Sequence, residues 1–173
     1  MSAKLFLMIG YPGAGKTTTA EMISKITGAV RLSSDEVRFS MFPEPTFSQE
    51  EHGLLYRELD SRTEALLRKG VSVIYDANLN RKSHRQEKYD ICERTGAVAV
   101  ALWLRTPRSL AKERAIHESR SHFAPKDETL GSMFERITEV FEPPTPEEHA
   151  LVLDGTALNE AQVSAFLADH HLL

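Results

Sequence analysis

The chain has 173 residues, of which 41% are hydrophobic and 27% are charged, so its composition is that of an ordinary globular protein and its length fits one domain over residues 1–173. The formal net charge of −4 at pH 7 argues against a protein that coats long nucleic acids, and no apolar run reaches the roughly 20 residues that a membrane span needs. The single cysteine, Cys92, excludes an internal disulfide, and the first predicted strand leaves no room for a signal peptide before it, so we expect a cytoplasmic protein.

The first predicted element is a buried strand over residues 5–9, and a glycine-rich motif follows it directly. The motif reads G-x-x-x-x-G-K-T from Gly10 to Thr17, and its place between a strand and a helix is typical of a phosphate-binding loop. Glycine lets backbone N–H groups approach a polyphosphate closely, Lys16 adds a positive charge, and the Thr17 hydroxyl is placed to bind Mg²⁺. The residues that we expect to bind the nucleotide are Gly10, Pro12, Gly13, Ala14, Gly15, Lys16, Thr17 and Thr18.

Gly28 is expected to cap the helix after this loop, and a second strand over residues 29–33 follows. Asp35 comes directly after that strand, at the edge where ligands bind in open α/β sheets. It is therefore the leading candidate for a catalytic carboxylate, and its alternative role is the N-cap of the next helix. Arg38 lies one helical turn further and would suit an acidic acceptor, unless it belongs to a solvated helix face.

A capping box at residues 48–51 predicts the start of a long amphipathic helix that ends at Gly70, and a third apolar strand covers residues 71–75. Asp76 closes this strand. A carboxylate in that place of a phosphate-loop protein orders Mg²⁺ or its water shell, and the alternative for Asp76 is a turn or cap residue. For Asn78 the sequence leaves contact with the substrate and a capping role equally open.

Basic residues gather in two stretches in the second half of the chain. The first stretch lies on the helix after the third strand, where it forms either a solvated face or a contact surface for the end of a nucleic acid strand; its residues are Arg81, Lys82, Arg85 and Lys88. A fourth strand is predicted over residues 97–104. The second stretch includes Arg114 and Arg120, which belong either to a lid over residues 114–128 or to plain surface charge.

The rest of the chain continues the same alternation. A helix is predicted from Asp127 to Phe141, a fifth strand over residues 151–154, and a last helix capped by Asn159. Strands and helices that alternate this regularly predict an α/β fold in which five parallel strands form one sheet with helices on both faces.

These candidates together provide what the transfer of a γ-phosphoryl group requires. The loop binds the phosphates, and Thr17 and Asp76 hold Mg²⁺. Asp35 takes the proton of an acceptor hydroxyl, and Arg114 and Arg120 neutralise the charge of the transition state. We therefore predict an enzyme that uses ATP and Mg²⁺ to phosphorylate a hydroxyl group. Its predicted catalytic residues are Lys16, Asp35, Arg114 and Arg120.

The stretches 10–17, 34–38 and 76–80, followed by the basic lid with Pro125, resemble in sequence and order a family of P-loop kinases. This family includes phage-type polynucleotide 5′-kinases and zeta toxin-like and small-molecule kinase relatives. The resemblance covers nearly the whole chain and implies a three-layer P-loop NTPase fold with the sheet order 2-3-1-4-5. Ala77 stands where polynucleotide kinases often have a hydroxyl residue, so one possible contact to the acceptor is missing.

The same resemblance assigns roles to four residues. It implies that Asp35 is the general base and that Arg38 binds a phosphate of the acceptor; apart from the resemblance, we also expect Asp76 and Asn78 to lie at the substrate. It also implies that Arg114 and Arg120 contact the phosphates of ATP, with the adenine near Arg114.

The sequence leaves the acceptor open between a 5′-hydroxyl end of a nucleic acid and a small hydroxylated metabolite or antibiotic. A third hypothesis is a nucleotide-dependent switch that hydrolyses its nucleotide slowly. Such switches commonly contain N-K-x-D and D-x-x-G, and neither string occurs in this sequence. ATP is therefore the expected nucleotide, no membrane partner is expected, and the oligomeric state is not indicated.

Overall fold

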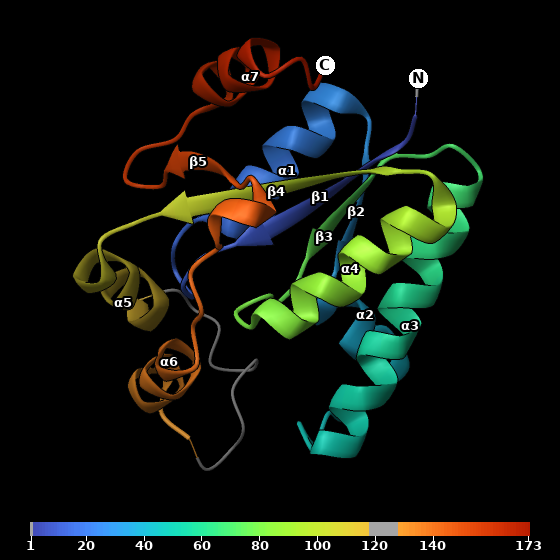
Figure 1. Cartoon of the computed structure of the whole chain (residues 1–173). Coiled ribbons are helices and arrows are strands. Elements are labelled where there is room, and N and C mark those ends of the chain that lie inside the picture. The colour runs from blue at the N-terminus through green and yellow to red at the C-terminus, as the bar shows by residue number, and fades with distance from the viewer. Residues whose placement is uncertain (1, 118–127) are drawn as a thin grey trace.

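The computed structural model of the chain describes residues 2–117 and 128–173. Five parallel strands form one sheet in the order β2-β3-β1-β4-β5, which confirms the predicted fold class and sheet order (Figure 1). The strands are β1 (Lys4–Ile9), β2 (Val30–Ser33), β3 (Val73–Asp76), β4 (Val98–Arg105) and β5 (Leu151–Asp154).

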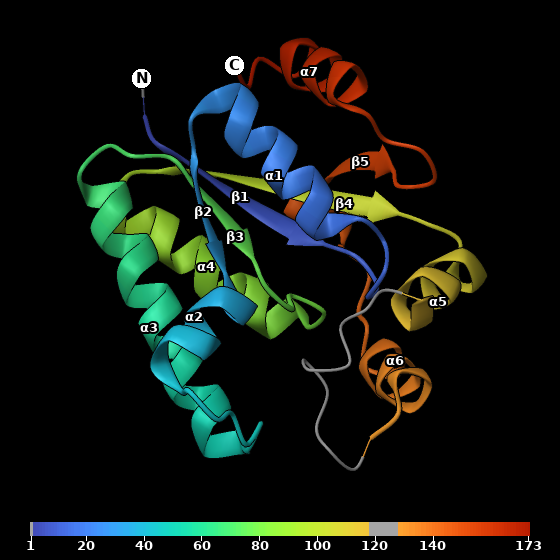
Figure 2. The ribbon, with the colours of Figure 1, turned by 180° about the vertical axis from the view of Figure 1, so that it is seen from behind.

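Helices cover both faces of this sheet. The opposite views of Figures 1 and 2 show α3 and α4 on one face and α1 and α7 on the other, with α5 and α6 together beyond one end of the strands. The helices are α1 (Lys16–Thr27), α2 (Ser34–Met41), α3 (Gln49–Arg68), α4 (Lys82–Thr95), α5 (Arg108–His117), α6 (Leu130–Glu139) and α7 (Glu160–Asp169), with a 3-10 turn η2 at Pro146–Glu148. None of the helices among the described residues is both long and apolar enough to cross a membrane.

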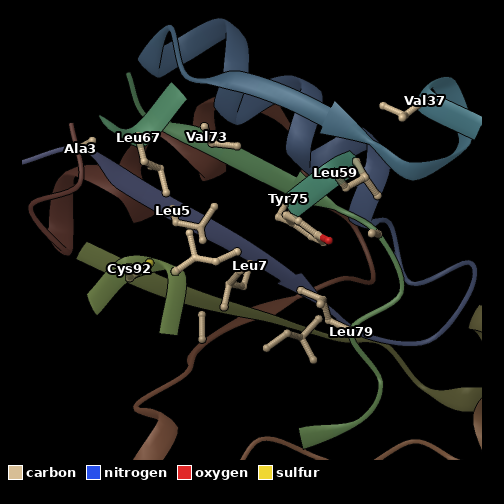
Figure 3. Close-up of a cluster of buried hydrophobic side chains, with 14 of the residues drawn as sticks. Ala3, Leu5, Leu7, Val37, Leu59, Leu67, Val73, Tyr75, Leu79 and Cys92 are labelled. Atoms are coloured by element: carbon tan, nitrogen blue, oxygen red, sulfur yellow. The ribbon is translucent and has the colours of Figure 1, made fainter. Parts of the chain in front are cut away.

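The central strand β1 has no polar face because it is covered from both sides. Leu5 and Leu7 pack in the cluster under α3 and α4, and Phe6 and Met8 pack in the cluster under α1 and α7. All four side chains are at most 1% exposed. Figure 3 shows the first cluster, in which Leu5, Leu7 and Tyr75 point to the same side of the sheet. This continuous apolar run is what a strand buried on both faces requires.

Most predicted helix ends are found, and one capping box is only half formed. Gly28 and Gly96 end α1 and α4 in the left-handed conformation. Ser48 caps α3, because its Oγ accepts a hydrogen bond of 3.2 Å from the Glu51 N–H. The Glu51 carboxylate, however, does not return to Ser48 but pairs with Arg38. The helix predicted from residue 127 begins at Leu130 in the structure, and Thr129 is its N-cap.

The basic stretch at the start of and along α4 lies only partly at the surface, which corrects both interpretations for two of its residues: Arg81 and Lys82 are exposed, whereas Arg85 and Lys88 are not. Arg85 and Lys88 are both 0% exposed. The Arg85 Nε lies 2.6 Å from Glu148, and the Lys88 Nζ lies 2.6 Å from Asp60 on α3. The charges of Arg85 and Lys88 are therefore neutralised by carboxylates inside the molecule. A nucleic acid strand cannot reach them without breaking these ion pairs.

The register of the sheet brings the three motif stretches to one edge. Ser33 at the end of β2 pairs with Asp76 at the end of β3, and β3 pairs with β1, which leads into the loop from Gly10. Because parallel strands end at the same edge of a sheet, residues 10–17, 34–38 and 76–80 meet there.

Candidate active site

The phosphate-binding loop turns tightly between β1 and α1 and packs against α5. Gly13 has a φ of +75°, and a Cβ atom added to it would come within 2.1 Å of the Ala111 carbonyl oxygen on α5. The Lys16 ammonium donates hydrogen bonds of 2.8 Å to the carbonyl oxygens of both Gly10 and Tyr11. The loop therefore has the backbone curvature and the cation that phosphate binding needs, next to the N-terminus of α1.

Asp76 lies beside Thr17 at the base of the site. The Thr17 hydroxyl donates to the Asp76 Oδ1 at 3.4 Å, and the Asp76 side chain is 6% exposed. Arg31 on β2 donates from its Nε to the other carboxylate oxygen at 2.9 Å. The Thr17 and Asp76 oxygens are hard ligands of the kind that Mg²⁺ prefers, so this pair fits the metal that accompanies a nucleotide. Sequence analysis missed Arg31, because its only signal was a basic residue within a short strand.

Asp35 lies in the first turn of α2 but is not its N-cap. The cap is Ser33, whose Oγ accepts a hydrogen bond of 3.4 Å from the Glu36 N–H. The alternative structural role for Asp35 is therefore taken by another residue. Asp35 instead lines a cavity of about 240 Å³ together with Lys16 and Asp76.

This cavity brings most of the predicted site residues together. From the loop and α1 it is lined by Gly10, Pro12, Gly13, Gly15, Lys16, Thr17 and Thr18. From the ends of β2 and β3 it is lined by Ser34, Asp35, Asp76, Ala77, Asn78 and Asn80. A largely apolar third wall, which the sequence analysis did not identify, consists of Ala115, Leu130, Met133 and Ile137. Ala14 does not line the cavity, because its side chain is 0% exposed in the core under α1 and α7.

Asn78 shapes the loop after β3 and also faces the cavity. Its Oδ1 accepts a hydrogen bond of 3.1 Å from the Asn80 N–H, so the side chain turns the backbone. Tyr56 on α3 holds the same residue, since its hydroxyl lies 3.2 Å from the Asn78 N and 3.4 Å from the Asn78 O. Burial raises the pKa of Tyr56 to about 12, which keeps this hydroxyl protonated. Asn78 therefore caps no helix, since Arg81 is the N-cap of α4, but it turns the loop and lines the cavity.

Arg38 is buried and ion-paired, so it does not belong to a solvated helix face. Its guanidinium is paired with Glu51, lies 3.4 Å from the His52 Nδ1 and is 4.9 Å above the Phe47 ring. Although burial opposes it, hydrogen bonds from Thr46 and Arg38 hold the pKa of Glu51 below its usual value. Arg38 is not among the residues that line the cavity.

Arg114 reaches the turn after β5 rather than the wall of the cavity. Its Nη1 donates to the Gly155 carbonyl oxygen at 2.7 Å, and its Nη2 donates to the Thr156 carbonyl oxygen. Gly155 fits there because a Cβ atom would lie 2.1 Å from the Thr106 Oγ1. Arg120, like residues 118–127 of the predicted lid, lies outside the described residues.

The fold is similar to that of solved kinases. A sugar kinase from Janibacter sp. matches over 99% of this chain and 96% of its own, with a TM-score of 0.68 and 22% identity. The APS kinase from Mycobacterium tuberculosis, solved with AMPPNP and APS, matches over 98% of both chains with a TM-score of 0.73 and 18% identity. A chain of the Pnkp1/Rnl/Hen1 RNA repair complex matches 80% of this chain and 44% of its own, with a TM-score of 0.66 and 21% identity.

No curated protein matches this sequence. The family model described as "AAA domain" matches residues 5–144, which is most of the chain and includes the phosphate-binding loop, Asp35 and Asp76. The match covers most of the chain, so the chain belongs to this AAA domain family.

Proposed function

We propose that this protein is an ATP-dependent phosphotransferase that moves the γ-phosphoryl group to an acceptor hydroxyl. The observation that carries the proposal is that Asp35 lines the same cavity as Lys16 and Thr17. A carboxylate at a cavity that a phosphate-binding loop also lines can take the proton that an acceptor hydroxyl must lose. Membership of the AAA domain family and the fold similarity to a sugar kinase and an APS kinase support the same conclusion.

Each residue has one task in this reaction. The loop and Lys16 would bind the β- and γ-phosphates, and Thr17 and Asp76 would hold Mg²⁺, which would neutralise charge on the phosphate oxygens. Asp35 accepts the proton of the acceptor hydroxyl as its oxygen bonds to the γ-phosphorus and the bond to the bridging oxygen breaks. Arg114, predicted to contact the phosphates, instead holds the turn after β5, where the resemblance places the adenine, and Arg120 is assigned to the phosphates by resemblance.

Two lines of support favour two different acceptors. The resemblance to polynucleotide 5′-kinases and the similarity to the Pnkp1 complex favour a 5′-hydroxyl nucleic acid end, contacted by Asn78 at the cavity. Arg38, which the resemblance assigns to a phosphate of the acceptor, would have to leave its ion pair with Glu51 to take part. The apolar wall of a cavity of only about 240 Å³, and the similarity to a sugar kinase, favour a small hydroxylated molecule. We also propose one domain over residues 1–173 and a cytoplasmic location, to which the free, buried Cys92 thiol is suited.

A transfer assay with γ-labelled ATP and Mg²⁺ tests the function. The acceptors are 5′-hydroxyl RNA and DNA oligonucleotides, glucose and APS. The variant Asp35→Asn should bind AMPPNP like the wild type but transfer label at least about 100-fold more slowly, because a general base is lost. Lys16→Ala should lose both binding and transfer.

Asp169→Asn is the matched control, because this carboxylate is exposed at the end of α7. It should transfer label at the wild-type rate. Undiminished transfer by Asp35→Asn would show that another group is the base, and label only in inorganic phosphate would favour the switch hypothesis.

A further inference from the structure

The short helix α6 is capped by a side chain from a distant part of the chain. A helix leaves its last four carbonyl groups without partners inside the helix, and the Ile137 carbonyl is one of these in α6. The Asn80 Nδ2 donates a hydrogen bond of 3.1 Å to this oxygen. Asn80 follows β3 and is 4% exposed, so the contact is made inside the molecule.

Asn80 is itself fixed by its neighbours. The Glu142 N–H, just after α6, donates to the Asn80 carbonyl oxygen at 2.8 Å. The buried Arg85 donates from one nitrogen to the carbonyl oxygens of Leu79 at 2.9 Å and of Glu142 at 3.0 Å, and its other nitrogens bind Glu148. Hydrogen bonds therefore hold the loop after β3 and the segment after α6 together on both sides of Asn80.

The helix held in this way forms part of the site. Leu130, Met133 and Ile137 are its contribution to the wall of the cavity. On the same face of α6, Phe134 is 0% exposed and its ring centroid lies 6.3 Å from that of Tyr11, a residue of the phosphate-binding loop. The position of α6 thus determines how far the apolar wall stands from the loop and from the start of α2.

We propose that Asn80 is a positioning residue that acts through α6, setting the apolar wall of the acceptor pocket by capping the end of that helix. The assignment of this cavity to the acceptor rests on the function proposed above. A local turn does not explain the carboxamide of Asn80, because Asn78 already turns this loop. A 10-residue helix is only marginally stable without tertiary contacts, so a hydrogen-bond donor at its C-terminal end helps to fix its position.

Hydrogen exchange and kinetics of three variants test this inference. Asn80→Ala removes the donor, and Asn80→Asp replaces it by a carboxylate of the same shape that faces the Ile137 oxygen. In both variants the amides of α6 should exchange about tenfold faster or more, since a buried carbonyl loses its partner. KM for the acceptor should rise more than kcat falls, because the apolar wall moves while the loop and Lys16 keep their places.

Asn159→Ala is the matched control, because Asn159 is an Asn that caps α7 away from the cavity, with its Oδ1 3.0 Å from the Gln162 N. It should speed exchange in α7 only and leave KM unchanged. Wild-type exchange in α6 of both Asn80 variants, or faster exchange with an unchanged KM for the acceptor, would overturn the inference. If the wild type phosphorylates none of the acceptors, the proposed function fails, and exchange in α6 alone then decides whether Asn80 holds the helix.

Discussion

Two glycines with the same backbone conformation differ in what surrounds them. Gly13 in the phosphate-binding loop has a φ of +75°, and Gly28 at the end of α1 has a φ of +74°. A Cβ atom at Gly28 would meet nothing within 4 Å, whereas at Gly13 it would collide with the backbone of α5. At Gly28, glycine is favoured only because the backbone has a positive φ. At Gly13, glycine also permits the close approach of the phosphate-binding loop to α5.

This comparison gives a matched pair of variants. Gly28→Ala should lower the free energy of unfolding by about 1–2 kcal/mol, the cost of a left-handed residue with a side chain, and should leave AMPPNP binding intact. Gly13→Ala adds a clash that displaces the loop from α5, so affinity for AMPPNP should fall at least about tenfold. Thermal unfolding and titration calorimetry measure both effects. Equal affinities in the two variants would contradict the assigned role of the α5 contact.

At the residue level, the sequence predicted those contacts that depend on motif order and strand ends. Lys16, Asp35 and Asp76 lie in one cavity because three consecutive motifs follow three parallel strands. Arg38 and Asn80 could not be placed in this way. Their partners, Glu51 and α6, are chosen by packing between elements, for which a single sequence contains no spacing rule.

At the level of elements, α4 and η2 are joined by an ion pair that lies almost entirely inside the molecule. The side chains of Arg85 and Glu148 are 0% and 4% exposed. Burial works against the charge of Glu148, but hydrogen bonds from Arg85 and from the Thr145 N–H outweigh it and lower the pKa of Glu148 to about 2. The burial of Arg85 and Lys88 does not follow from the basic pattern, because a charge run on a helix is usually solvated, and here η2 and α3 supply the opposite charges.

The lowered pKa makes a prediction about acid stability. Glu148 gives up its proton more readily in the folded state, so its contribution of about 3 kcal/mol is present above the unfolded pKa and is lost as the pH falls from about 5 towards 2. Glu148→Gln should be about 3–5 kcal/mol less stable at pH 7, because Arg85 keeps a buried charge without a partner. Its unfolding free energy should also depend less on pH in this range.

Urea unfolding between pH 2 and 7 measures both quantities. Glu64→Gln is the control, because Glu64 pairs with Arg68 and Arg94 at the surface, where the pairs contribute little. If the unfolding free energy of Glu148→Gln depended on pH as strongly as that of the wild type, other carboxylates would be responsible for the acid sensitivity.

For the whole molecule, the core on the α3 and α4 face contains a natural reporter of unfolding. Cys92 on α4 is 4% exposed, and burial raises its pKa to about 11. The thiolate is the reactive form, so the folded protein should resist thiol reagents at pH 7.5, and labelling has to wait until α4 leaves the sheet. Because Cys92 packs in the same cluster as β1, which leads into the phosphate-binding loop, its release is expected to require unfolding of the nucleotide site as well.

Ligand binding should therefore slow the labelling of Cys92 although the thiol is remote from the cavity. AMPPNP with Mg²⁺ at about 100 times its dissociation constant should reduce the labelling rate about 100-fold, because only the folded state binds it. Lys16→Ala should lose this protection while its labelling rate without nucleotide stays near that of the wild type. Protection in the Lys16 variant would mean that nucleotide binds elsewhere, and labelling of the wild type at an unchanged rate would mean that α4 opens locally, without the loss of the site.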